Sequence, residues 1–217
     1  MKRRTFSNQL LGLGLGSSLF PLAQLAHAQG DAVEGKDYVR LNPPLPVPAS
    51  GKIEVLEFFW YGCPHCNAFE PLLEAWAKKL PEDIGFRRVP VAFREEPFTT
   101  HQKIFYALEA LGLVSSMHRK VFFAIHVERA KLDKLSSIVE FMSKSGVDAT
   151  KFSEAFNSFS VNTKAGQARK LAEAYRIDGV PAIGVGGRFW TSGTLANTLE
   201  RSLSVADQLI QRTRKAG

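Results

Sequence analysis

The feature that most restricts the fold is an apolar run that leads directly into the only two cysteines of the chain. Residues 53–60, IEVLEFFW, are β-rich and almost wholly apolar, which is typical of a central strand covered on both faces. Cys63 and Cys66 follow after two residues, with Pro64 and His65 between them. A disulfide of this span closes almost no loop and would stabilise little. Two thiols are also too few for a tetrahedral zinc site. The pair therefore indicates that the thiols take part in a reaction and do not serve a structural purpose.

The rest of the chain is divided by hydrophobic periodicity and by its prolines and glycines. After the cysteines, apolar residues recur at helical spacing until Pro81, with Pro71 inside this helix, where it should introduce a kink. A second strand, a helical block, another helix, a hairpin of two short strands and a terminal helix are then predicted at residues 84–93, 98–160, 162–175, 180–190 and 195–214. This order predicts an α/β fold with a helical insertion.

The first 28 residues have the composition of an export signal. MKRRTF is basic, LLGLGLGSSLFPLAQL is apolar but interrupted by glycine and proline, and AHA places small residues before Gln29. Arg3 and Arg4 before a glycine-containing apolar stretch resemble a twin-arginine signal, and an ordinary secretory signal stays open. The alternative is a buried N-terminal helix. We expect an exported protein, whose cysteines meet an oxidising compartment.

Charge and spacing argue against nucleic acid and against a haem cofactor. Three of the seven net positive charges lie in the predicted signal, at Lys2, Arg3 and Arg4, which leaves a mildly basic chain. No cluster of Lys and Arg with interleaved aromatic residues supports nucleic-acid binding. A covalent haem needs a histidine directly after the second cysteine, where this chain has Asn67. We therefore expect no nucleic acid, cofactor or metal.

The motifs together resemble one known family. Strand, Cys-x-x-Cys, helix and strand, followed later by helix, hairpin and helix with a Val-Pro opening the hairpin, is similar to the thioredoxin fold. VLEFFWYGCPHC, GVPAIGV and the helical block resemble the DsbA family of periplasmic thiol:disulfide oxidoreductases over nearly the whole mature chain. This resemblance implies a signal peptide at residues 1–28, a thioredoxin-like domain formed by 29–97 and 163–217, and an inserted helical domain at 98–162.

Position along the helix predicts different chemistry for the two thiols. Cys63 should lie at the helix N-terminus, where free backbone N–H groups and the positive end of the dipole favour a thiolate. His65 can add a donor or a positive charge there, with Pro64 completing the candidate catalytic set. Stabilising the thiolate makes the disulfide a better oxidant. Cys63 is then the exposed sulfur attacked by a substrate thiolate, and Cys66, one turn inward, is the resolving thiol.

Val180 and Pro181 are the candidate substrate-binding residues. A proline at this position is commonly a turn or edge-strand residue. The resemblance instead implies a cis Val-Pro bond that faces the cysteines. Such a proline prevents regular strand pairing and leaves the Val180 backbone free to pair with an extended substrate chain.

Glu57 is the one charge in the middle of the apolar strand. Alternation places Val55, Glu57 and Phe59 on one face and Leu56, Phe58 and Trp60 on the other, with both faces buried. A lone carboxylate there is costly unless it is paired or protonated. It can have a structural partner such as a lysine or a buried water. The resemblance implies a different role, in which Glu57 relays the proton of Cys66.

The remaining singled-out residues are assigned structural roles. His101, His118 and His126 lie in the helical block and are predicted to be surface or interface histidines. Trp76 and the phenylalanines at helical spacing are predicted to lie in the core.

The predicted function is a periplasmic oxidase that introduces disulfide bonds into exported proteins through Cys63 and Cys66. Its expected partners are reduced, unfolded exported proteins and a membrane quinone-linked re-oxidase of the DsbB type. A disulfide isomerase or reductase, and a non-catalytic peptide-binding holdase, are the alternatives. Isomerases of this fold usually carry a separate dimerisation domain, and about 24 residues between the predicted cleavage site and the first strand are too few for one. We therefore expect a monomer.

Overall fold

The computed structural model describes residues 30–46 and 51–215. Within these ranges lie five strands: β1 Val39–Arg40, β2 Ile53–Phe59, β3 Ile84–Pro90, β4 Ala182–Val185 and β5 Phe189–Ser192. The same ranges hold seven helices: α1 Pro64–Ala77, α2 Phe98–Ala110, α3 Val114–His126, α4 Leu135–Lys144, α5 Ala149–Asn157, α6 Phe159–Ala174 and α7 Leu199–Lys215. The predicted signal peptide at residues 1–28 lies outside the described residues. No helix in the described ranges has both the length and the apolar character needed to cross a membrane.

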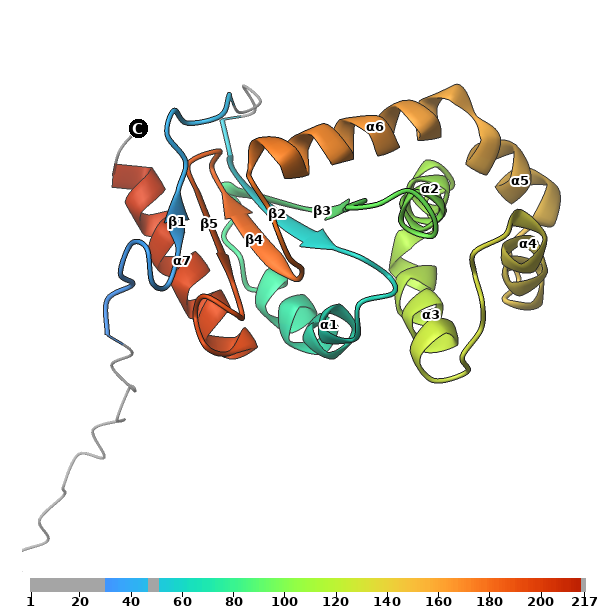
Figure 1. The fold of residues 1–217 in the computed structure, drawn as a ribbon, viewed down its shortest axis with the longest axis horizontal. Helices are drawn as coiled ribbons and strands as arrows, with labels where there is room; N and C mark the ends of the chain where they lie inside the picture. Colours follow the sequence, from blue (N-terminus) through green and yellow to red (C-terminus); the bar gives the residue numbers. More distant parts are fainter. Residues whose placement is uncertain (1–29, 47–50, 216–217) are drawn as a thin grey trace, which may run out of the picture. The chain divides into compact units, whose positions relative to one another are not determined.

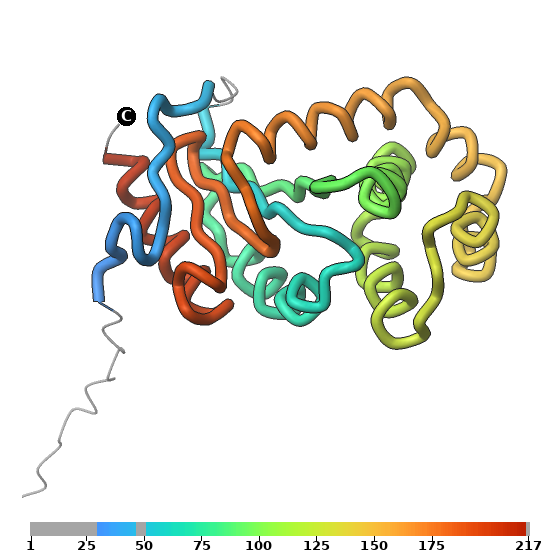
Figure 2. Tube along the Cα trace, in the orientation of Figure 1, coloured from blue at the N-terminus to red at the C-terminus, as the bar shows by residue number. Residues whose placement is uncertain are grey.

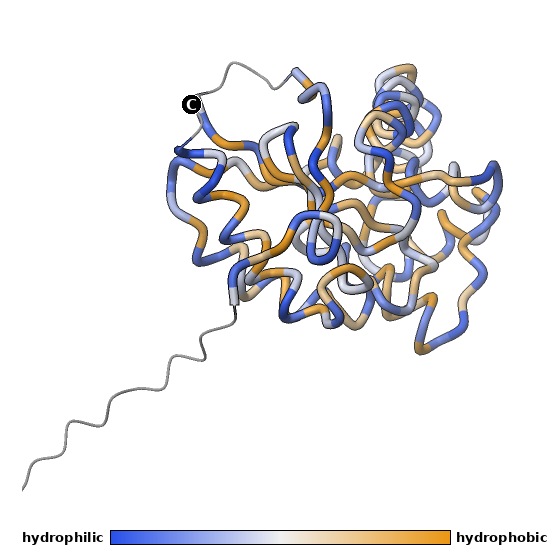
Figure 3. The backbone as a smooth tube through the Cα atoms, turned by 60° about the vertical axis from the view of Figure 1, so that its left-hand side comes forward, coloured by the Kyte–Doolittle hydropathy of each residue, from blue (hydrophilic) through white to orange (hydrophobic). Residues whose placement is uncertain are grey.

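The strands form one mixed sheet in the order β1-β5-β4-β2-β3 (Figure 1). β2 lies inside the sheet, parallel to β3 and antiparallel to β4. This position explains its almost wholly apolar sequence, because both of its faces are covered. Figure 3 shows hydrophilic and hydrophobic stretches alternating along the chain, as expected where elements bury one face and expose the other. The predicted α/β fold of the thioredoxin type is confirmed.

Helices cover both faces of the sheet. α1 and α7 pack together on one face, where Val55 of β2 joins a core with Phe69 and Leu73 of α1. On the other face Phe58 packs against Tyr175, which directly follows α6, with ring centroids 5.1 Å apart. The alternation predicted for β2 therefore holds, and the face that carries Val55 is the one that also carries Glu57.

The helical block leaves the sheet after β3 and returns through α6 (Figure 2). α6 runs without interruption across residues 162 and 163, so the boundary predicted there falls inside a helix, and the domain limits stay a prediction. The phenylalanines at helical spacing that are predicted to lie in the core include Phe152, Phe156 and Phe159. The first two are buried in α5, but Phe159 is 87 % exposed, because Ser158 caps a new helix by accepting a hydrogen bond from the Val161 N–H.

Several elements begin or end at other residues than predicted. The terminal helix begins at Leu199, four residues later than predicted, because the Thr198 hydroxyl accepts a hydrogen bond from the Arg201 N–H at 3.0 Å and caps it. The second strand ends at Pro90. α1 ends at Ala77, before Pro81, and holds Pro71 inside it.

Gly184 provides a test of packing between β4 and the residue that follows α6. A β-carbon at this position would lie 2.6 Å from Cε1 of Tyr175, and Tyr175 is held in place because its hydroxyl accepts a hydrogen bond from the Gly187 N–H. We expect Gly184→Ala to lower the free energy of unfolding by about 1–3 kcal/mol, the range for overpacked cores. Urea denaturation measures the change. As the matched control, Gly166→Ala in exposed, open surroundings on α6 should raise stability by about 0.5–1 kcal/mol. Equal effects at the two sites would contradict the packing argument.

Candidate active site

The turn between β2 and α1 fixes the position of Cys63. The Cys63 N–H donates to the Trp60 carbonyl at 2.9 Å, and Cys63 is the N-cap of α1. Pro64 occupies the first helical position, where its missing N–H leaves no hydrogen bond unmade. Position 62 has room only for glycine, because a β-carbon there would lie 2.3 Å from the Trp60 ring. The sulfur of Cys63 is thereby held at the N-terminus of the helix.

Cys63 has an acidic thiol. The Cys66 N–H lies 3.4 Å from Cys63 Sγ and donates to it. The pKa of Cys63 is lowered from 9.0 to about 6, first by a hydrogen bond from the Cys66 side chain, then by the backbone N–H groups of Cys66 and His65 and by the charge of His65. Burial opposes this shift without cancelling it. Predicted as exposed, Cys63 is in fact only 7 % exposed.

The thiol of Cys66, in contrast, is less acidic than an ordinary cysteine. Both cysteines are free thiols, and Cys66 is fully buried one turn into α1. Burial raises the pKa of Cys66 well above 9.0, and the neighbouring Cys63 sulfur adds to the shift. The pair therefore holds one thiol that is a thiolate at neutral pH and one that keeps its proton.

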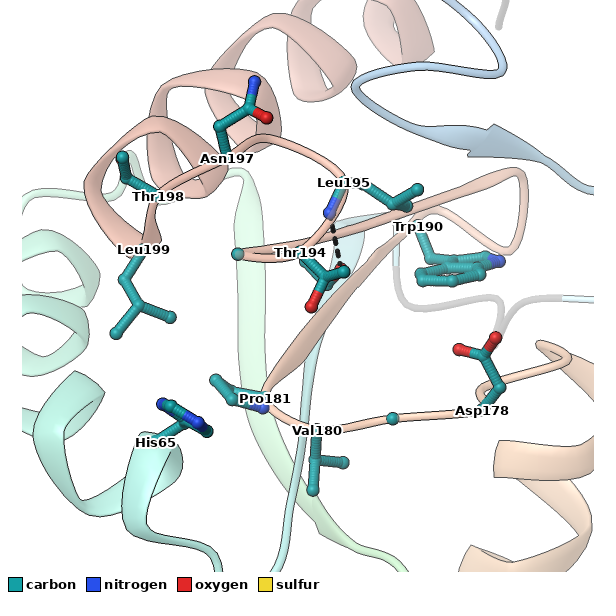
Figure 4. Close-up of a pocket in the computed structure, with 13 residues that line it drawn as sticks. His65, Asp178, Val180, Pro181, Trp190, Thr194, Leu195, Asn197, Thr198 and Leu199 are labelled. Carbon is teal, nitrogen blue, oxygen red and sulfur yellow. Dashed lines mark hydrogen bonds between the residues drawn. The ribbon is translucent and has the colours of Figure 1, made fainter.

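A groove lies next to the cysteines and is lined by His65 of α1, by the segment before β4, and by residues from β5 to the start of α7. Its volume is about 560 Å³. Figure 4 shows His65 and Leu199 at one end, Trp190 and Asp178 at the other, and Val180 and Pro181 between them. The Val180–Pro181 peptide bond is cis, as the family resemblance implied.

The Val180 backbone reaches the reactive sulfur. Cys63 Sγ lies 3.3 Å from the Val180 carbonyl oxygen, to which the thiol donates. Both Val180 and Pro181 precede β4, so they lie outside the ladder of the sheet. The structure thus brings together the predicted residues of the cysteine motif and of the Val-Pro segment.

Glu57 lies fully buried, and its partner is an arginine that was not predicted. Arg88 Nε on β3 is 2.9 Å from Glu57 Oε2. The N–H is not aligned with the carboxylate, so the contact is an ion pair, and neither oxygen of Glu57 receives a hydrogen bond within the described part of the chain. Burial, followed by the charge of Glu70, raises the pKa of Glu57 well above its ordinary value.

Arg88 begins a buried network that sequence reasoning missed. Its Nη2 donates to Glu70 Oε2 at 2.7 Å, and the other oxygen of Glu70 is 3.0 Å from His118 Nε2. His118 Nδ1 is 2.9 Å from the Tyr61 hydroxyl. The network therefore runs from Glu57 on β2 to Tyr61 in the turn before Cys63.

The helical-block histidines were predicted to lie at the surface or an interface, and two of them are not at the surface. Both lie where the helical block meets the segment after β2, since His118 contacts the Tyr61 hydroxyl and His101 stacks on the Trp60 ring. His118 is 3 % exposed and His101 is 5 % exposed. Burial lowers the pKa of His101 to about 4. His126 is half-buried and its Nε2 donates to the Tyr61 carbonyl at 2.8 Å. The sequence did carry a signal, because His118, Phe122 and His126 recur every four residues on one helix face.

Trp76 was predicted to lie in the core. Trp76 packs only partly against the core, since its indole N–H donates to Asp207 at 2.9 Å near the surface. Within residues 30–46 and 51–215, no group of three or more His, Cys, Asp or Glu side chains is arranged to hold a metal ion.

Comparison with known proteins gives full-length relatives. A family model described as the DSBA-like thioredoxin domain matches residues 54–204. The chain is 45% identical over 218 residues to the thiol:disulfide interchange protein DsbA of Bordetella pertussis, which covers 99% of this chain and 100% of that protein. It is similar to the crystal structure of Pseudomonas aeruginosa DsbA, with a TM-score of 0.81 and 43% identity over 84% of this chain and 94% of that one. The DsbA of Xylella fastidiosa gives a TM-score of 0.78 at 32% identity, over 85% and 98% of the two chains.

The acidity of Cys63 can be measured by thiolate ultraviolet absorbance. We expect the reduced protein to titrate near pH 6, and Cys66→Ala to raise this midpoint more than His65→Ala, because the Cys66 side chain makes the largest contribution. Asn67→Ala is the control, since Asn67 contacts Cys63 through a backbone N–H that the variant keeps. The depressed pKa also stabilises the reduced fold fully above pH 9.0, and this stabilisation is lost as the pH falls through about 6. An unchanged midpoint in Cys66→Ala would refute the assignment.

Proposed function

Since the chain belongs to the DSBA-like thioredoxin domain family and is a thiol:disulfide oxidoreductase, we propose that it works as an oxidase on exported proteins through Cys63 and Cys66. The Cys63–Cys66 disulfide takes two electrons from two substrate thiols. The substrate gains a disulfide, and the enzyme is left as the dithiol. In this reaction Cys63 is the sulfur that substrate attacks, and Cys66 is the leaving and resolving thiol.

The single observation that carries this proposal is the opposite acidity of the two thiols. The pKa of Cys63 is lowered to about 6 by hydrogen bonds from Cys66 and the start of α1, whereas burial raises the pKa of Cys66. A stabilised thiolate favours the reduced form of the enzyme, so its disulfide is readily reduced and is a strong oxidant. It also makes Cys63 a good leaving group when the second substrate thiolate attacks the mixed disulfide.

The difference in exposure between the two sulfurs supports the roles proposed for Cys63 and Cys66. Cys63 is 7 % exposed and borders the groove through its contact with the Val180 carbonyl, whereas Cys66 is fully buried. A substrate thiolate can therefore reach Cys63 first. His65 lines the same groove and supports the thiolate through its charge and its backbone N–H.

Glu57 is proposed as the proton relay for Cys66. Cys66 must gain a proton when it leaves the disulfide and lose one when it attacks a mixed disulfide. A group that takes up and releases a proton works best when its pKa is raised or lowered toward the operating pH. Burial raises the pKa of Glu57 well above its ordinary value, and the ionised form of Glu57 raises the pKa of Cys66.

The groove is proposed to bind an extended segment of substrate. Val180 and Pro181 precede β4, and Pro181 has no N–H to give to a neighbouring strand. Pairing of a substrate backbone with Val180 would be β-augmentation, which reads main-chain groups and accepts many sequences. This explains how one site serves many unfolded partners.

Membership of the family supports a proposal for the partners and the location. We propose that the substrates are reduced, unfolded exported proteins, that a membrane quinone-linked re-oxidase of the DsbB type restores the disulfide, and that the protein works as a monomer in the periplasm. The 45% identity to a named DsbA over almost the whole chain supports these assignments.

The oxidase reaction is tested with a reduced, unfolded protein and two cysteine variants. We expect the wild type to be reduced by mild glutathione buffers and to oxidise the substrate in a one-to-one ratio. Cys63→Ser should abolish oxidation and mixed-disulfide formation. Cys66→Ser should accumulate substrate as stable mixed disulfides, because the resolving thiol is gone. Non-reducing electrophoresis and mass spectrometry measure the adducts.

The same experiment separates the alternatives. A reductase or isomerase would leave the substrate reduced or would reshuffle a scrambled substrate faster than it oxidises a reduced one. A holdase would suppress aggregation equally well with both cysteines replaced by serine. If Cys66→Ser formed no adducts, the division of roles between the two cysteines would be wrong.

Glu57→Gln tests the relay and has a defined pH signature. Because the folded pKa of Glu57 is raised, its contribution to stability is full below about pH 4.5 and is lost as the pH rises through the folded pKa. Glutamine is neutral at every pH, so the variant should match the wild type in acid and exceed it in stability near neutral pH. Attack by Cys66 on a mixed disulfide should be slower. A variant that is less stable at neutral pH and equally fast would make Glu57 a paired structural residue.

A further inference from the structure

Two buried carboxyl groups share one cation in this protein. Glu57 on β2 and Glu70 on α1 have fully buried side chains, and Arg88 on β3 contacts both. Arg88 Nε lies 2.9 Å from Glu57, and its Nη2 lies 2.7 Å from Glu70. One positive charge balances one carboxylate, and a second buried carboxylate would be very costly. The Glu57–Glu70 pair therefore holds one proton.

Hydrogen bonding distinguishes the two members of the pair. Glu70 accepts an N–H from Arg88 on one oxygen and faces His118 Nε2 at 3.0 Å on the other. Glu57 has no donor aligned with either oxygen within the described ranges, and its contact with Arg88 Nε at 2.9 Å is an ion pair only. A buried carboxylate is stable when donors point at it and unstable when none does. The proton therefore belongs on Glu57, and Glu70 is the anion.

The partners of His118 also fix its tautomer. An ionised Glu70 can only accept, so Nε2 of His118 carries the hydrogen. Nδ1 is then the acceptor, and the Tyr61 hydroxyl donates to it at 2.9 Å. Burial lowers the pKa of His118, which keeps the ring neutral. His118 is thus a neutral donor aimed at Glu70.

We propose that His118 is a positioning residue that keeps the single proton of the Glu57–Glu70 pair on Glu57. By donating Nε2–H to Glu70, it stabilises charge on that carboxyl and leaves Glu57 as the protonated member. When it is ionised, Glu57 is the member that raises the pKa of Cys66. The inference deepens the proposed relay, because His118 decides which carboxyl can exchange a proton with the buried thiol.

The other ionisable groups around the pair do not supply a competing charge. The pKa of Tyr61 is raised by burial, as is that of Cys66, so both stay neutral near pH 7. Glu74, on the outer part of α1, acts on Arg88 and His118 through its charge. It makes Arg88 more firmly cationic and leaves the hydrogen-bond difference between Glu57 and Glu70 unchanged.

The test is a pH titration of the carboxyl carbon resonances of Glu57 and Glu70 in the reduced full-length protein. In the wild type at pH 7 we expect Glu57 to be protonated and Glu70 to be ionised. His118→Asn shortens the side chain and removes the donor to Glu70. The acid dissociation constant of Glu57 should then rise about ten-fold or more, as expected for the loss of a hydrogen bond to a charged group. His118→Gln, whose amide N–H reaches the place of Nε2, should keep the wild-type value.

Matched controls separate this role from a structural one. His126→Asn makes the same exchange on the same helix, where the ring contacts the Tyr61 carbonyl and not Glu70, so the Glu57 titration should be unchanged. His118→Phe removes the donor while keeping a ring, and replaces His118→Asn if the amide prevents folding. The proposal is overturned if Glu70 holds the proton in the wild type, or if the donor-free variants leave the Glu57 titration unchanged. The titration needs no thiol exchange, so failure of the proposed relay would not alter its outcome.

Discussion

The start of α1 is the constraint on which the rest of the site depends. It shifts the pKa values of the two cysteines in opposite directions, because Cys63 caps the helix while Cys66 is buried one turn inside it. Backbone N–H groups that the helix cannot use internally are directed at the first sulfur. The second sulfur is fully buried, which penalises its charged form. Pro64 and Gly62 make this start possible, since one fits the first helical position and the other leaves room for the Trp60 ring.

Beneath the cysteines, the protein keeps charges where an apolar core would be more stable. A buried ion pair rarely repays the free energy of removing its charges from water. Here Arg88 serves two buried carboxyls, so the arrangement cannot be neutral without a trapped proton. Groups with such perturbed pKa values gather at functional sites. The network therefore fits the proton relay proposed for Cys66 better than a role as a source of stability.

Short motifs and hydrophobic periodicity in the sequence predicted much of the fold but only about half of the residues of the site. The cysteine motif, the Val-Pro segment and the buried place of Glu57 were all visible, because each lies within one short stretch of sequence. Arg88 and Glu70 were missed because a charge in a strand or helix ordinarily faces solvent, and periodicity cannot say which charges from distant elements meet. Phe159 shows the converse error, since a continued apolar spacing concealed the helix break capped by Ser158.

The helical block is part of the redox centre as well as a cover for the sheet. α3 holds Tyr61 at two points, with His118 at the hydroxyl and His126 at the carbonyl, and Phe122 packs on the ring between them at a centroid distance of 5.0 Å. Tyr61 lies two residues before Cys63, so the position of α3 and the geometry of the turn are linked. His118 is also bonded to Glu70 on α1. A displacement of α3 would therefore disturb the start of α1 and the buried proton together, which explains why an insertion far away in sequence contributes two histidines to a site built around two cysteines.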